Sequence, residues 1–329
     1  MLCILALCGG CLKRSPIWST YEVPSAYNFL NVNDSAQWRL LTMADQLMAK
    51  VDSGNTKGTV VSATALNTLF DSGLAAYCNA AAKTDLQNYF DSVALYSQST
   101  VAGAPGTAGV SGGYLLSPGG TYFAAMIKTA LTTGIMAYNI GGLLADSVGN
   151  DIPNTHPIPG WGTQMEHAWD EAFGWFGVPI DFPKDTLHLR YLGYYSKRVD
   201  SGLQSNNTLM TAFLTGRAAI TGTDMGTKQT QASLIIATVE QLEAASAIHE
   251  LNIADAQPQI APAALSEALG LIKGLSYYTS ASRLITDTQI AQAESYFTAG
   301  NIYAGANTAA IRQLLGSVYT FSTTQMAAF

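Results

Sequence analysis

The sequence predicts an all-α protein made of two duplicated helical bundles related by a pseudo-twofold axis. Apolar side chains recur at helical spacing along most of the chain, which indicates helices with one buried face. No two segments show the alternating pattern and turn residues of a strand pair. Segments of the second half repeat segments of the first half in the same order, which indicates an internal duplication.

Composition limits the class of protein and of partner. The chain has 329 residues, of which 48% are hydrophobic and 12% are charged, so much of it is interior or weakly polar surface. The formal net charge is −7, and the longest basic cluster is the ordinary pair Lys197–Arg198. No basic patch is available to neutralise phosphates, which argues against nucleic acid as a partner.

The N-terminus resembles a bacterial lipoprotein signal peptide. Residues 1–11 form an apolar run that ends in small residues before Cys11, the expected lipidation site. The run lacks a preceding positive charge, and Cys8 stands where such signals carry Leu or Val. A short hydrophobic N-terminus of a soluble protein is the alternative. Lipidation would anchor the protein to a membrane of the cell envelope, at the outer membrane or cell surface, and would leave Cys78 without a disulfide partner.

The first bundle is assigned to residues 35–182. Residues 12–34 lack helical periodicity and are expected to be a linker and an extended lead-in. The glycines between Thr100 and Gly120 lack the spacing of a phosphate-binding loop and predict a flexible loop. Helices are expected over Ser35–Val51, Ser62–Tyr77, Lys83–Gln98, Thr121–Asp146 with a break near Gly141–Gly142, and a segment around His167 that ends at Gly177 and Pro179.

The second bundle is assigned to residues 183–329. Its expected helices are Thr186–Val199, Asn207–Gly222, Thr227–Ile253, Pro262–Thr279, Thr286–Phe297 and Asn307–Val318. Pro262 suits the first turn of its helix, because proline needs no backbone hydrogen bond there.

A narrow polar stripe runs along the otherwise apolar helix around His167. Each residue of a helix turns by about 100°, which places His167, Asp170, Glu171 and Gly174 on one line. Tryptophan, phenylalanine and alanine cover the remaining circumference. Because buried charge is costly unless it is paired or bound to metal, the stripe is a candidate metal or substrate site.

The internal repeat gives this helix a partner in the second half. The matched pairs are Phe70–Ala76 with Phe213–Ala219, Ala137–Ile140 with Glu250–Ile253, and His167–Gly174 with Ala263–Gly270. The second stripe contains Ser266, Glu267 and two glycines, small residues that allow another helix to approach closely. We expect the two stripes to face each other and to bring His167, Glu171 and Glu267 into one site.

Several segments of the chain resemble the imelysin-like group of bacterial surface lipoproteins, and more closely the family called domain of unknown function 4856. The resemblance covers residue 21 to the C-terminus and is carried by Tyr21–Phe29, His167–Gly174, Phe176–Pro179, Phe213–Ile220 and Ala264–Ala268. The resemblance implies two helical bundles and a Gly-x-His-x-x-Glu signature. Imelysins are named for a peptidase activity and are associated with iron uptake. His167 and Asp170 match the signature His and Glu, whereas Met165 replaces its Gly and alanine replaces a His expected before Ser266.

Three functions follow as hypotheses. The first is binding of iron, another divalent metal or a metal-bearing ligand between the bundles, with His167, Asp170, Glu171 and Glu267 as ligands. Arg217 is then a charge partner, and Glu171 or Glu267 is expected to pair with it if it is buried. The iron association also implies an outer-membrane transport partner.

The two alternatives use the same stripe differently. An imelysin-type metal-dependent peptidase is the second hypothesis, although His249–Glu250 lacks the second His of a zinc-peptidase motif. The third is a structural or interaction lipoprotein without metal. In that case His167 and Glu171 hydrogen-bond with each other and with Arg217, and the stripe only sets the register of the helices.

Overall fold

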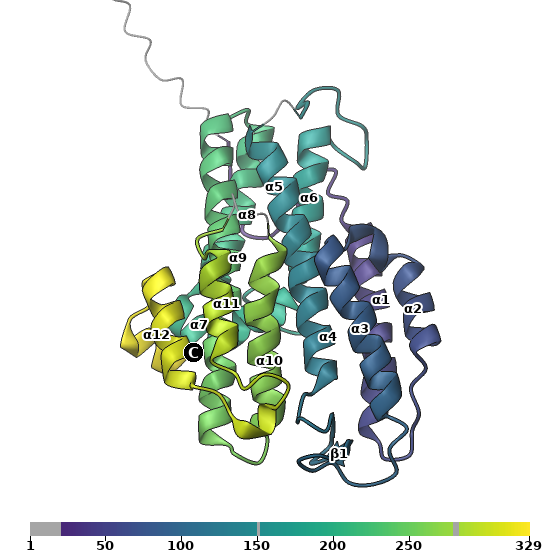
Figure 1. Cartoon of the computed structure of the whole chain (residues 1–329). Coiled ribbons are helices and arrows are strands. Elements are labelled where there is room, and N and C mark those ends of the chain that lie inside the picture. Colours follow the sequence, from purple (N-terminus) through teal and green to yellow (C-terminus); the bar gives the residue numbers. More distant parts are fainter. Residues whose placement is uncertain (1–20, 150–151, 279–282) are drawn as a thin grey trace, which may run out of the picture.

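Helices dominate the computed structural model, which describes residues 21–149, 152–278 and 283–329 (Figure 1). The all-α prediction is therefore confirmed. The first part contains α1 (Ser35–Asp52), η1 (Ser53–Asn55), α2 (Ala63–Asp71), η2 (Leu74–Tyr77), α3 (Ala80–Tyr96), β1 (Gly109–Ser111), β2 (Tyr114–Leu116), α4 (Phe123–Leu131), the π-helix η3 (Thr132–Ala137), α5 (Tyr138–Gly149) and α6 (Gln164–Phe176). The second part contains α7 (Leu192–Leu203), α8 (Ser205–Thr221), α9 (Met225–Ala256), α10 (Ala261–Gly274), η4 (Leu275–Tyr277), α11 (Asp287–Ser295), η5 (Ile302–Ala304), α12 (Thr308–Tyr319) and α13 (Thr323–Ala328).

The long helix α9 joins the parts of the molecule. It packs along α8 and α10 and also contacts α5, α7 and α12. In Figure 1, α1 to α4 stand on one side, α7 and α9 to α12 on the other, and α5, α6 and α8 at one end. Within the described ranges, no helix has both the length and the apolar character needed to cross a membrane.

The proposed duplication stays a prediction, as does the division of the chain at residue 182. Two matched pairs lie on helices in both halves, one at the junction of η3 and α5 and on α9, the other on α6 and α10. The third pair differs in local structure. Phe70–Ala76 crosses the end of α2 and enters η2, whereas Phe213–Ala219 lies inside α8.

The glycine-rich segment contains a small hairpin, so the prediction that the chain has no strand pair is wrong. β1 and β2 pair antiparallel, with Gly109 opposite Leu116. Gly112 and Gly113 form the connection and have φ values of 58° and 87°. Two residues in the left-handed region match the twist of a tight hairpin, and glycine adopts this conformation without steric cost. The Gly-Gly pair was the signal in the sequence.

The helix predicted over Thr121–Asp146 departs from regular α-helical geometry at a different place from the one predicted. It does not break at Gly141–Gly142 but forms the π-helical turn η3. This turn releases the carbonyl oxygen of Gly134, which accepts a hydrogen bond from the backbone N–H of Asn79 at 2.9 Å. The backbone can approach here because glycine has no Cβ, which would overlap Ala82. The π turn therefore docks the start of α3 against the helix.

The expected helix Thr186–Val199 begins only at Leu192. His188 and Tyr191 have φ values of 60° and 43°, outside the right-handed helical region. The backbone N–H of Arg190 instead donates to the carbonyl of Gly177, beyond the end of α6. This tertiary hydrogen bond holds the segment across the end of α6 and competes with the local helical pattern.

The small-residue stripe on α10 does allow close approach of a helix, but that helix is α4 with its π turn. Ser266 Oγ accepts a hydrogen bond from the backbone N–H of Tyr122 at 2.9 Å. A Cβ at Gly270 would overlap Thr129, and one at Gly274 would overlap Thr133. The α6 stripe faces α1 instead, with Gly174 against Gln37. The two stripes therefore do not face each other, contrary to expectation.

The contact between α6 and α8 leads to a prediction about Gly216. A Cβ at this position would overlap the indole of Trp169, which is fully buried and donates to the carbonyl of Phe213 at 3.0 Å. Gly216→Ala should lower the free energy of unfolding by about 1–3 kcal/mol, because overpacking displaces the ring. Urea unfolding of the purified protein measures this.

Gly142→Ala is the matched control for this prediction. Gly142 lies within α5, and a Cβ there would have no neighbour within 4 Å. This substitution should stabilise the protein by about 0.5–1 kcal/mol through backbone entropy. Equal stability of Gly216→Ala and the wild type would contradict the close packing of Trp169.

Candidate functional site

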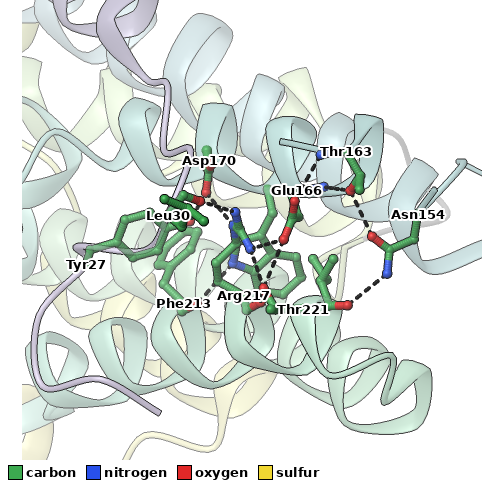
Figure 2. Close-up of polar contacts among 11 residues, drawn as sticks. Tyr27, Leu30, Asn154, Thr163, Glu166, Asp170, Phe213, Arg217 and Thr221 are labelled. Atoms are coloured by element: carbon green, nitrogen blue, oxygen red, sulfur yellow. Dashed lines mark hydrogen bonds and ion pairs between the residues drawn. The ribbon is translucent and has the colours of Figure 1, made fainter. Parts of the chain in front are cut away.

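Arg217 of α8 lies at the centre of a buried polar network (Figure 2). Its side chain has no exposed surface. Nε donates to Asp170 Oδ1 at 2.8 Å, and Nη1 donates to Glu166 Oε1 at 2.7 Å and to Thr221 Oγ1 at 2.8 Å. Arg217 therefore has acidic partners, as its burial requires. They are Glu166 and Asp170, one turn apart on α6, and the expectation of Glu171 or Glu267 is wrong.

The lead-in to α1 completes this network. Tyr27 donates its hydroxyl hydrogen to Asp170 Oδ1 at 2.8 Å, and its ring stacks on Phe173 with centroids 3.7 Å apart. The carbonyl of Leu30 accepts a hydrogen bond from Arg217 Nη2 at 3.4 Å. The segment before α1 is thus tied to α6 and α8 by polar contacts, and Figure 2 shows it passing across the network.

A capping box places Glu166 in the network. Thr163 precedes α6, and its Oγ1 accepts from the backbone N–H of Glu166 at 3.2 Å. In return, Glu166 Oε2 accepts from the backbone N–H of Thr163 at 2.9 Å. This arrangement satisfies two free amides at the start of the helix and points the other carboxylate oxygen at Arg217. The Thr-x-x-Glu pattern could have been found in the sequence.

Burial and pairing shift the pKa values of the two carboxyl groups of this network in opposite directions. Burial raises the pKa of Asp170 to about 6, although Arg217 and Tyr27 favour its ionised form. Burial also acts upward on Glu166, but the Thr163 amide and Arg217 outweigh it and lower the pKa of this carboxyl. Both acids are held by groups of the protein itself. The network can therefore fix the relative positions of α6, α8 and the lead-in.

His167 and Glu171 form a second, shallower group. His167 Nε2 lies 3.6 Å from Glu171 Oε1, and the imidazole stacks on Trp161 with centroids 4.1 Å apart. Gln37 Nε2 donates to Glu171 Oε1 at 3.0 Å. Burial lowers the pKa of His167 against the opposing effect of Glu171. The expected contact between His167 and Glu171 is present, but neither residue bonds to Arg217.

Glu267 lies in a third group, formed by α10, α7, α4 and α9. Its Oε1 accepts from the hydroxyl of Tyr195 at 2.6 Å and from Lys128 Nζ at 3.2 Å. Arg198 Nη1 lies 3.7 Å from the same oxygen and 2.6 Å from Glu250 Oε1. Two cations therefore surround Glu267, and a positive neighbourhood disfavours a metal ion.

The four expected ligands are thus divided among three surroundings. The structure brings His167 and Glu171 together, and joins Asp170 to Arg217, but does not add Glu267 to either group. In the described part of the chain, no group of three or more His, Cys, Asp or Glu side chains is arranged to hold a metal ion. Cys11 lies outside the described residues, so its lipidation stays a prediction.

A cleft lies beside the Glu267 group, between the first and second parts of the chain. It comprises two adjoining cavities of about 510 and 490 Å³ that share His188, Leu189 and Tyr194. The larger is also lined by Asp45, Met48, Asp52, Lys128, Arg190 and Tyr191, and the smaller by Thr186, Lys197 and Arg198. Its walls are therefore α1, α4, the segment before α7, and the start of α7.

Local sequence patterns do not predict this cleft. Its tyrosines fit the apolar spacing of a helix, so they predict packing, and the basic pair Lys197–Arg198 looks ordinary. Lys128 and Asp52 are far from them in sequence and meet them only in the fold. His188 and Tyr191, which line the cleft, have left-handed backbone conformations. Such strain in residues other than glycine concentrates at functional sites.

Comparison with known proteins relates part of the chain to a family. A search of curated proteins and a search of solved structures found no match. Residues 160–305 match the family model described as Domain of unknown function (DUF4856). This range includes α6, Arg217, Glu267, and the segment before α7 and the start of α7 that line the cleft. The relation to imelysins stays a prediction. The resemblance to this family is therefore confirmed over residues 160–305.

Proposed function

We propose that the protein binds a small ligand in the cleft between α1, α4 and the start of α7, and that it does so at the cell envelope, tethered through Cys11. The observation that carries the proposal is the pair of adjoining cavities, about 510 and 490 Å³, where the two parts of the chain meet. Clefts of this size that combine apolar and aromatic side chains with converging polar groups are typical of small-molecule sites.

The local structure supports this proposal. The segment before α7 leaves the helix that its apolar spacing favours and presents Leu189, His188 and Tyr191 to the cleft. Tyr194 is 39% exposed there despite its size. Lys128 Nζ lies 4.5 Å from the centre of the Tyr194 ring, which holds the ammonium over an aromatic face. These side chains are positioned by the fold before any ligand arrives.

In this proposal, iron or another metal reaches the protein as part of a metal-bearing ligand in the cleft. The alternative, a metal held by His167, Asp170, Glu171 and Glu267, would need these side chains in one place. The described residues offer no support for the peptidase alternative, because His167 faces Trp161 and Glu171 without further ligands. The Arg217 network serves stability in this proposal.

A cleft-filling variant tests the proposal. Leu189 lines both cavities, so Leu189→Trp should fill the site, whereas Leu187→Trp changes a side chain that is 67% exposed and is absent from the lining. The melting temperature is measured with citrate, ferric citrate, arginine and glucose. At least one compound should raise it in the wild type and in Leu187→Trp but not in Leu189→Trp, because binding stabilises the folded state. No rise with any compound, or an equal rise in Leu189→Trp, would sink the proposal.

A further inference from the structure

We infer that the ligand of this cleft is an organic anion, a carboxylate or phosphate group on an apolar body, an inference that rests on the proposed function. Four cationic side chains line the two cavities, namely Lys128, Arg190, Lys197 and Arg198. Among the described residues, two carboxylates line them, Asp45 and Asp52. This local excess of positive charge stands out in a chain whose formal net charge is −7.

The cations differ in how far protein carboxylates neutralise them. Arg190 Nε lies 3.4 Å from Asp45, and Lys128 Nζ lies 3.2 Å from Glu267. Lys197 Nζ donates to the hydroxyl of Thr186 at 3.1 Å and makes no ion pair with any carboxylate of the described residues. An anion in the cleft would therefore meet an ammonium group whose charge no neighbouring acid cancels.

Arg198, next to Lys197, has two acidic neighbours, Glu250 and Glu267. Its partner Glu250 is 3% exposed, and burial, followed by repulsion from Glu267, raises the pKa of Glu250 to about 8. The charged and titratable groups that act on Glu250 are Arg198 and Tyr195 of α7, Glu267 of α10 and Lys128 of α4. Glu267 is shared in turn, because Arg198 and Lys128 lie 3.7 and 3.2 Å from the same carboxylate oxygen.

The remaining walls are suited to the apolar body of such a ligand. Met48 and Leu189 contribute apolar surface, and Tyr191 and Tyr194 contribute aromatic surface to the larger cavity. Lys128 and Arg198 lie 4.5 and 5.3 Å from the centre of the Tyr194 ring, so that two cations adjoin this aromatic surface. The cleft therefore offers both cations and apolar surface to such a ligand.

Matched probes test the charge of the ligand on the full chain. 2-Naphthoate and its neutral isostere 2-naphthamide are titrated at neutral pH and low salt, and binding is followed by calorimetry. The carboxylate should bind about tenfold more tightly than the amide. Lys197→Met should weaken naphthoate binding about threefold, as expected for one exposed cation, and leave naphthamide binding unchanged. Lys57→Met, which removes an exposed lysine outside the cleft lining, should change neither affinity.

Three outcomes would overturn the inference. The first is naphthamide binding as tightly as naphthoate, and the second is naphthoate binding that is insensitive to Lys197→Met. The third is the absence of binding by both probes. The proposed function is judged separately, by whether any of the four compounds of its own test stabilises the wild type but not Leu189→Trp. A cleft that binds only glucose or arginine would uphold the proposed function and contradict the inference that its ligand is an anion.

Discussion

Arg217→Met is expected to lower the free energy of unfolding by about 3–5 kcal/mol, because it leaves buried carboxylates without their cation. Asp170 has no exposed surface, and Arg217 donates to it and to Glu166. Methionine fills part of the volume but neutralises neither acid. The loss should grow from acid to neutral pH as the acids ionise. Urea unfolding at several pH values measures the loss in free energy of unfolding and its dependence on pH.

Two further variants show whether charge is the cause. Arg39→Met replaces an exposed arginine of α1 and should change the stability by less than about 0.5 kcal/mol. The triple variant Arg217→Met, Glu166→Gln, Asp170→Asn should recover part of the loss, because no unpaired buried charge remains. A loss no greater than that of Arg39→Met would show that water solvates Arg217, contrary to its burial.

The sequence predicted α6, its polar stripe and its end, but assigned the partners of the stripe incorrectly. Helical spacing fixes which side chains share a face, so Asp170 was identified as polar and inward. The same spacing places Glu166 one turn earlier on that face, outside the predicted stripe, which begins at His167. Tyr27 lies 143 residues from Asp170, and no local pattern connects positions so far apart.

The polar stripes on α6 and α10 show that local spacing predicts a close helix contact but not which helix makes it. Gly270 and Gly274 correctly predicted a close helix contact, because only small residues allow backbones to approach. Which helix fills the gap depends on the tertiary arrangement, and α4 occupies it. The cleft is less predictable still. It depends on Arg190 bonding to Gly177, a long-range hydrogen bond that overrides a locally helical pattern.

Glu250→Gln is expected to stabilise the protein at alkaline pH. Burial raises the pKa of Glu250 from 4.5 to about 8, with repulsion from Glu267 as the next cause. Below pH 4.5 both the folded and the unfolded protein bind this proton, so the group does not affect stability there. As the pH rises toward 8, only the unfolded state releases the proton, and stability falls by on the order of a few kcal/mol. Above the folded pKa the loss is complete.

Glutamine is neutral at every pH, so the variant should avoid this loss. Its stability, measured by urea unfolding from pH 4.5 to 9, should match that of the wild type at the acid end and exceed it increasingly toward pH 8. Glu22→Gln, at an exposed position of the lead-in, serves as the control and should follow the wild type throughout. Parallel curves for Glu250→Gln and the wild type would mean that Glu250 is ionised in the folded protein. In that case Arg198 would be neutralised by Glu250, and the cleft would lose part of its positive charge.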